Sequence, residues 1–223
     1  MPRLPRRRTA ITTMVSALVL AAAGAATAAS VWDLDFTAEA TDTISSFGVP
    51  NTATYGQTIT VPDGPAELST FSIAMDVPAT VVFRGAVQAW DGTAGMATGP
   101  VLYLSDPMST SGTGMETVTF SPNIPITAGA YVLYTTVSYD YAVGSGTGRW
   151  AASTANPYAD GQFVYMNSGS GIDALTTSTW SNIGGYDAGF TVVFAAAPVV
   201  EPPVVEPPAP VAIPIVAAPA FTG

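Results

Sequence analysis

The spacing of apolar residues constrains the fold of this chain more than any other feature. Between residues 57 and 194, apolar side chains recur at every second position in short runs, and no apolar 3.6-residue period lasts for three turns. A period of two places alternate side chains on the two faces of a strand, whereas an amphipathic helix needs the longer period. Residues 81–105 show the pattern clearly, because two runs flank the turn DGTAG (residues 91–95). The second run, residues 101–104, is predicted to be a buried strand.

About eight or nine such runs, separated by clusters of Gly, Pro, Asn and Asp, predict an all-β fold. We expect residues 55–194 to form an antiparallel β-sandwich of the jelly-roll type. Before it, residues 29–54 are expected to hold a first strand (residues 31–36) and a polar loop (residues 37–50). The predicted core contains the residues on the more apolar face of each run: Phe71, Ile73, Phe83, Val87, Leu102, Val118, Leu133, Phe163, Phe190 and Val192.

The two ends of the chain depart from this pattern. Residues 1–28 combine a basic start, an apolar stretch and the small residues Ala26-Thr27-Ala28, which together predict a cleaved secretory signal peptide. A transmembrane anchor is the alternative, but polar residues interrupt the apolar stretch. Residues 195–223 contain eight prolines and the duplication VVEPPVVEPP. Because proline fixes φ and removes a donor, we expect a disordered, extended spacer that the fold does not need.

The charge of the chain excludes some classes of partner. With residues 1–28 removed, the chain keeps two arginines against sixteen acidic residues, a formal charge of −14. Nucleic-acid affinity comes mainly from Lys and Arg that displace counterions, so no nucleic-acid partner is expected. Anionic membranes are disfavoured for the same reason, and no membrane span is expected after signal cleavage. The chain has no cysteine, so an exported fold must rest on its core without disulfides.

The residue inventory also limits catalysis. The chain contains no His, Lys or Cys, which excludes Ser-His-Asp triads and Ser-Lys dyads and leaves zinc chemistry to carboxylates alone. A pair of carboxylates, as in glycoside hydrolysis, is the one familiar option that remains. Its candidates are Glu67, Asp76, Glu116 and Asp187, which nothing in the sequence pairs. We therefore expect a protein that is not an enzyme.

Aromatic residues at strand ends and in loops favour a binding function instead. The best candidate site is the group Tyr139, Tyr141, Arg149 and Trp150, which lies around the Gly-rich turn of residues 144–148. Ring faces can stack on sugars, a Gly-rich turn lets a loop approach a ligand, and an Arg can bond a sugar hydroxyl. The alternative is that these rings close the edges of the sandwich. The other rings at such positions are Trp90, Tyr103, Tyr158, Trp180 and Tyr186.

Calcium is a further alternative, because it prefers oxygen ligands and the chain is rich in Asp and Asn. The only D-x-D pattern is Asp33-Leu34-Asp35, whose Leu suits a strand better than a ligand loop. Asp91 and Asp140 could each add one ligand, although such residues usually shape turns. We expect no cofactor, with a structural Ca²⁺ ion as the alternative.

Several motifs occur in an order that resembles a known group of proteins. The motifs are QTITVP (residues 57–62), AWDG (89–92), GPVLYLS (99–105), GAYV (129–132) and YDAGF (186–190). In this order they resemble the small secreted β-sandwich proteins of Gram-negative bacteria that often carry PEP-CTERM-like sorting tails. The resemblance covers residues 55–194. Val200-Glu201-Pro202 is similar to the start of such a tail, but the apolar segment and basic end of the tail do not follow it. The resemblance implies an extracytoplasmic location and no particular activity.

Together, these observations favour a non-catalytic secreted or cell-surface β-sandwich protein with a structural or interaction role. One alternative is a carbohydrate-binding module that uses loop aromatics, and another is a carboxylate-dependent glycoside hydrolase. Glycans or cell-surface proteins are the expected partners. The expected location is outside a bacterial cell or on its outer surface, with the periplasm as the alternative.

Overall fold

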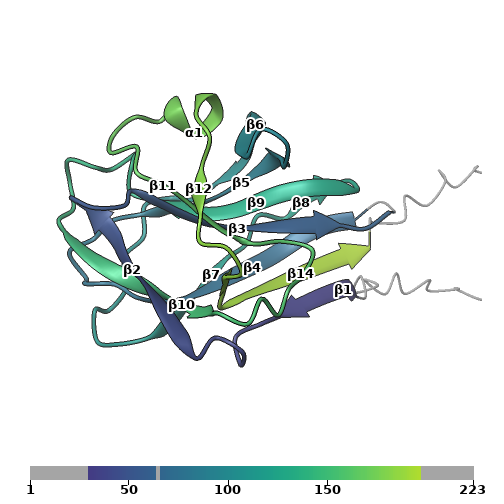
Figure 1. Ribbon diagram of the computed structural model, residues 1–223, viewed down its shortest axis with the longest axis horizontal. Helices are drawn as coiled ribbons and strands as arrows, with labels where there is room; N and C mark the ends of the chain where they lie inside the picture. The colour runs from purple at the N-terminus through teal and green to yellow at the C-terminus, as the bar shows by residue number, and fades with distance from the viewer. Residues whose placement is uncertain (1–29, 64–65, 197–223) are drawn as a thin grey trace, which may run out of the picture.

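The computed structural model describes residues 30–63 and 66–196, which form two antiparallel β-sheets packed face to face (Figure 1). The prediction of an all-β antiparallel sandwich is confirmed. The predicted signal peptide, residues 1–28, lies outside the described residues. The predicted tail, residues 195–223, starts two residues too early, because Ala195 and Ala196 belong to the final strand. Its remaining residues lie outside the described residues.

Sheet A, the lower layer in Figure 1, is organised around its longest strand, β4 (Ala66–Asp76). β14 (Phe190–Ala196) pairs with β4, and β1 (Ser30–Asp35) pairs with β14, as the expected first strand. Ser30 stands opposite Ala195, so the two ends of the described chain lie side by side. The other strands of sheet A are β2 (Asp42–Val49), β7 (Glu116–Phe120), β8 (Ile124–Ile126), β10 (Gly146–Ser153) and β13 (Asp187–Ala188).

Sheet B, the upper layer, has the strand order β12-β11-β3-β9-β5-β6 (Figure 1). Its central strand, β9 (Gly129–Thr136), pairs with β3 (Thr54–Val61) on one side and with β5 (Arg84–Asp91) on the other. The remaining strands are β6 (Met96–Leu104), β11 (Phe163–Met166) and β12 (Ser181–Asn182). One short helix, α1 (Ala174–Thr177), lies on the outer side of this sheet (Figure 1).

The core between the sheets contains nine of the ten residues predicted for it. The exception is Leu102, whose side chain is 39% exposed, and the prediction of a buried strand at residues 101–104 is wrong. β6 is an edge strand, and its pairing with β5 is irregular: Tyr103 stands opposite Val87, but Thr98 stands opposite Ala89. The extra residues between them form a bulge that turns the apolar run outwards. Of this run, only Tyr103 packs against the core.

The polar loop expected at residues 37–50 is also wrong, because most of it forms β2, which pairs with β10. A bulge explains why the sequence pattern missed the strand. The register shifts between Ser45 and Phe47, so the two buried side chains of β2, Ile44 and Phe47, are three residues apart instead of two. At Gly48, φ is +119° and a Cβ atom would collide with the carbonyl of Gly146, so only glycine fits there.

A second, smaller apolar cluster lies on the outer face of sheet B. The segment of residues 167–180, which includes α1 and ends just before β12, runs over this face and places Leu175 and Trp180 on it. Trp180 donates its indole N–H to the carbonyl of Leu175 at 2.9 Å, and its backbone N–H to the carbonyl of Gly95 at 2.8 Å. We call this segment the cover. The sheet residues beneath it are Ala86, Ala97, Val132, Tyr134, Val164 and Met166.

Candidate functional site

The outer face of sheet B carries a row of side chains along β5. Alternation places Arg84, Ala86, Gln88 and Trp90 on this face, while Val87 points into the core. Gln88 is buried: its side-chain oxygen accepts a 2.7 Å bond from the Tyr134 hydroxyl, and its amide donates to the carbonyl of Gly99 at 3.2 Å. The row thus begins with a cation and ends with a half-buried indole, and its middle is fixed by polar contacts.

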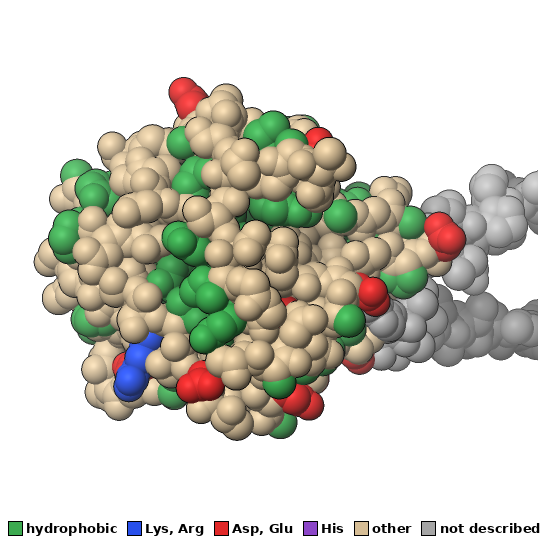
Figure 2. Space-filling view, in the orientation of Figure 1, with side chains coloured by type: hydrophobic (Ala, Val, Ile, Leu, Met, Phe, Trp, Pro, Cys, Tyr) green, Lys and Arg blue, Asp and Glu red, His purple; other side chains and the backbone are tan. Residues whose placement is uncertain are grey.

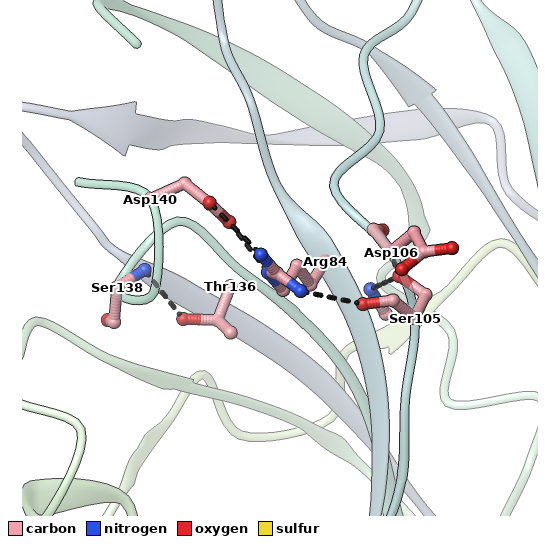
Figure 3. A network of polar contacts seen from close by, with 7 residues as sticks. Arg84, Ser105, Asp106, Thr136, Ser138 and Asp140 are labelled. Carbon is pink, nitrogen blue, oxygen red and sulfur yellow. Dashed lines mark hydrogen bonds and ion pairs between the residues drawn. The ribbon is translucent and has the colours of Figure 1, made fainter. Parts of the chain in front are cut away.

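The Arg84 end of the row is a closed structural network (Figure 3). Arg84 lies between two partners: its Nε and Nη2 donate to the two carboxylate oxygens of Asp140, at 2.8 and 3.2 Å, and its Nη1 donates to the carbonyl of Ser105 at 3.2 Å. The bond to Asp140 raises the pKa of Arg84 above its ordinary value. The ring of Tyr139 lies 6.0 Å from the guanidinium carbon. These contacts tie the end of β5 to two loops and leave little of the arginine for a ligand.

The structure does not bring the four predicted site residues together. Arg149 and Trp150 are neighbours on β10, so they point to opposite faces of sheet A. Trp150 is fully buried, with its ring 5.6 Å from that of Tyr55. Tyr139 belongs to the Arg84 network, and Tyr141 packs against the core. Trp150 therefore cannot stack on a ligand, and the packing alternative is confirmed for this ring.

Arg149 instead lies in an open polar hollow of about 320 Å³, formed where β2 and β10 meet the end of β4. Its Nη2 donates to the carboxylate of Asp76 at 2.8 Å, and both side chains are partly exposed. The other lining residues include Ser45, Ser46 and Thr147, and none of the described residues that line the hollow is aromatic. Figure 2 shows one basic patch on this face, whereas acidic side chains are spread around the outline. An exposed ion pair of this kind contributes little to stability or affinity.

Three of the four candidate catalytic carboxylates are bound to structural partners. Asp76 pairs with Arg149, and Glu116 accepts a 2.9 Å bond from the backbone N–H of Ser111. Asp187 is fully buried, and this burial raises the pKa of its carboxyl above the ordinary value. The fourth, Glu67, is half-buried at the opposite end of β4 from Asp76.

The aspartates that were candidate calcium ligands also shape the backbone. Asp91 accepts 2.9 Å bonds from the N–H groups of Thr93 and Ala94, and Asp35 accepts a 3.0 Å bond from the N–H of Thr37. Within residues 30–63 and 66–196, no three acidic side chains converge in a way that would hold a metal ion.

Sequence reasoning missed a hollow of about 250 Å³ at the Trp90 end of the row. We call it the Trp90 hollow. Its floor comes from strands β3, β5 and β9, and its rim from the loop before β11. No local pattern predicts it, because its residues come from four separate parts of the chain. The lining residues are Thr58, Ile59, Thr60, Trp90, Gly92, Ala130, Asp160, Gly161 and Gln162.

A strip of exposed aliphatic side chains lies at the edge of the same sheet, where β6 adjoins the cover, to which Ile172 belongs. We call Val101, Leu102, Leu104 and Ile172 the β6 strip; each is between 36% and 39% exposed. Val101 and Ile172 also line a shallow hollow of about 200 Å³ together with Gln88 and Tyr139. The sequence showed the apolar run of β6 but not that it faces solvent.

Comparison with protein-family models, with curated proteins and with solved structures finds no match to this chain. In the part of the chain that the structure describes, no helix is long and apolar enough to cross a membrane. Function is therefore inferred from the side chains described above.

Proposed function

We propose that this protein is a non-catalytic, exported β-sandwich that acts as a structural or interaction component by holding a partner on its surface. The observation that carries the proposal is the β6 strip, where Val101, Leu102 and Leu104 are 39%, 39% and 36% exposed within four residues of one edge strand. Exposed apolar side chains gathered on one strand mark a candidate surface for another molecule to cover. An unprotected edge strand is also the part of a sheet most ready to accept a partner.

The secreted or cell-surface location is part of the same proposal. It is supported by the signal-like residues 1–28. The non-catalytic role is supported by Asp76, Glu116 and Asp187, whose carboxylates are engaged in structural contacts.

The proposal is tested by placing charge on the strip. The double variant Leu102→Lys, Leu104→Lys changes two exposed side chains, so its thermal midpoint is expected to stay within a few degrees of the wild type. Labelled full-length protein is mixed with the cells that produce it, and the fraction that sediments with them is measured. We expect retention to fall at least three-fold.

Met115→Lys is the matched control, because Met115 is also exposed, at 47%, but lies outside β6 and the cover. It adds a lysine elsewhere on the protein and is expected to leave retention unchanged. If the double variant is as stable as the wild type and retained as strongly, the β6 strip is not the interaction surface and the proposal loses its support.

A further inference from the structure

We propose that the Trp90 hollow is a binding site for one neutral pyranose unit of a glycan. This inference does not use the β6 strip, and the hollow lies on the other side of the cover. It places glycan recognition on the face of sheet B, away from the group Tyr139, Tyr141, Arg149 and Trp150.

The size of the hollow suits a single small ring. At about 250 Å³, it falls below the roughly 300–1,000 Å³ of pockets that enclose drug-sized ligands. It is open on one side, so a ring that enters it can belong to a longer chain. Its aromatic wall is the indole of Trp90, which is only half buried. A flat indole offers an apolar surface that matches the C–H face of a pyranose.

Unpaired polar side chains surround this aromatic wall. Among the described residues, the Asp160 carboxylate, the Gln162 side-chain amide and the indole N–H of Trp90 make no hydrogen bond to the protein. They supply an acceptor, an amide that both donates and accepts, and a donor. Hydroxyl groups around a sugar ring both donate and accept, so they can pair with all three. An apolar ligand of the same size would offer these groups no hydrogen-bond partner.

Charge favours a neutral sugar over an acidic one. Asp160 is the one ionisable side chain among the described residues that line the hollow. The nearest part of β5 adds Asp91, which is exposed. Both described arginines are bound elsewhere, Arg84 to Asp140 and Arg149 to Asp76. A carboxylate or sulfate on the ligand would therefore meet repulsion without a cation to offset it.

The walls of the hollow are held in place before any ligand arrives. Thr58 donates to the carbonyl of Gln162 at 3.2 Å, and Thr60 donates to the carbonyl of Asp160 at 2.9 Å, which fastens the rim to β3. A Cβ at position 161 would collide with the carbonyl of Thr58 and the ring of Tyr158, so Gly161 permits this close approach. On the other side, the Trp90 ring meets Trp180 edge to face, with centroids 5.7 Å apart. A preorganised site loses less entropy when it binds.

Titration with monosaccharides tests the inference directly. The indole N–H signals of the full-length, ¹⁵N-labelled protein are followed by NMR while methyl glucoside, methyl galactoside, methyl mannoside, N-acetylglucosamine or glucuronate is added. We expect at least one neutral sugar to shift the Trp90 signal saturably, with a dissociation constant in the millimolar range. Glucuronate is expected to bind at least five-fold more weakly.

Two variants separate binding in the hollow from non-specific effects. Ala130→Leu places a larger side chain on the floor of the hollow and is expected to abolish the shift. Gln162→Ala removes a polar partner on the rim and is expected to weaken binding at least three-fold, which keeps the test valid if Ala130→Leu does not fold. Asp33→Asn removes one exposed charge from β1 in sheet A and is the control that should bind like the wild type.

Three results would overturn the inference. One is that no neutral sugar shifts the Trp90 signal. Another is a shift that survives in folded Ala130→Leu protein. The third is a shift produced by a synthetic VVEPPVVEPP peptide but by no sugar, which would assign the hollow to a proline-rich segment. None of these results bears on retention through the β6 strip, so the two proposals can fail separately.

Discussion

Replacing Gln57 with Leu tests the polar link that joins the two sheets through the core. Gln57 lies on β3 in sheet B and is fully buried. Its amide donates to the Asp187 carboxylate at 2.8 Å, and its side-chain oxygen accepts a 2.9 Å bond from the N–H of Ala188, both on β13 in sheet A. Leu has nearly the same volume, so the variant removes these bonds while changing the packing little.

The expected loss follows from the two groups left behind. A hydrogen bond to a charged group contributes about 1.5–3 kcal/mol, and a buried N–H without a partner costs about 1–3 kcal/mol. Gln57→Leu removes the hydrogen bond to the Asp187 carboxylate and leaves the N–H of Ala188 without a partner. We therefore expect the free energy of unfolding to fall by about 3–5 kcal/mol at neutral pH. That is a large part of the roughly 5–15 kcal/mol that stabilises a typical domain.

The loss should also depend on pH, because Asp187 is ionisable. Burial raises its pKa above the ordinary value of 3.8, while hydrogen bonds from the Tyr158 N–H and from Gln57 act in the opposite direction. When the pKa of a carboxyl is higher in the folded than in the unfolded protein, its contribution to stability is fully present below the unfolded-state pKa. That contribution is lost as pH rises through the folded-state pKa. Without Gln57 the pKa rises further. The cost of Gln57→Leu is therefore expected to be larger at pH 7 than at pH 4.

Urea titration at pH 4 and pH 7, followed by circular dichroism, measures both effects. Gln88→Leu is the matched control: Gln88 is equally buried in sheet B, but its partners are the Tyr134 hydroxyl and a backbone carbonyl. Burial raises the pKa of Tyr134 above its ordinary value of 10.0, so this control should lose the same amount at both pH values. A loss below about 1 kcal/mol for Gln57→Leu at pH 7 would refute the reasoning. So would equal losses at the two pH values.

Other predictions concern the core and the end of the chain. Phe83→Ala is expected to cost about 3–5 kcal/mol and Leu102→Ala less than about 1 kcal/mol in urea titration, because only the first side chain is buried. Trp150→Ala should cost about 3–5 kcal/mol. Trp150→Phe should cost much less, because the buried indole N–H has no partner among the described residues; equal losses would contradict this. Deleting residues 198–223 should leave the thermal midpoint unchanged, since β14 ends at Ala196; a clear drop would show that these residues support the fold.

The fold was predictable for strands in which apolar and polar side chains alternate strictly and which have a neighbouring strand on each side. Phe71 and Ile73 of β4 follow the period of two and lie in the core as expected. The prediction failed where backbone irregularity hides that period. β2 was missed because a bulge separates Ile44 and Phe47 by three residues, and β6 was assigned to the interior because an apolar run does not reveal that its strand lies at an edge.

The candidate sites were less predictable, because closeness in sequence is a poor guide to closeness on a sheet. Arg149 and Trp150 are adjacent in the chain, yet the strand geometry of β10 sends one side chain outwards and the other into the core. The Gly-rich residues before them suggested a flexible loop, but Gly146 and Gly148 are part of that strand. The residues of the Trp90 hollow, in contrast, are far apart in the sequence but close together in the fold. Trp90, Ala130 and Asp160 are at least 30 positions apart, and only the pairing of β5 with β9 and of β9 with β3 brings them together.

The cover explains why the sheet B face has two distinct surfaces. All six residues of β9 from Tyr131 to Thr136 are buried, so this strand is enclosed on both faces, by the core and by the cover. The outer face of the sheet is no longer covered along β3, where Thr58 is buried but Thr60 is exposed. The Trp90 hollow lies at that boundary, with a floor of paired strands and only its rim supplied by a loop. On the other side of the cover, β6 has β5 as its single neighbouring strand in the described sheet, and its aliphatic side chains face solvent. Because the cover is tied by Trp180 to the turn between β5 and β6, both surfaces depend on this one segment.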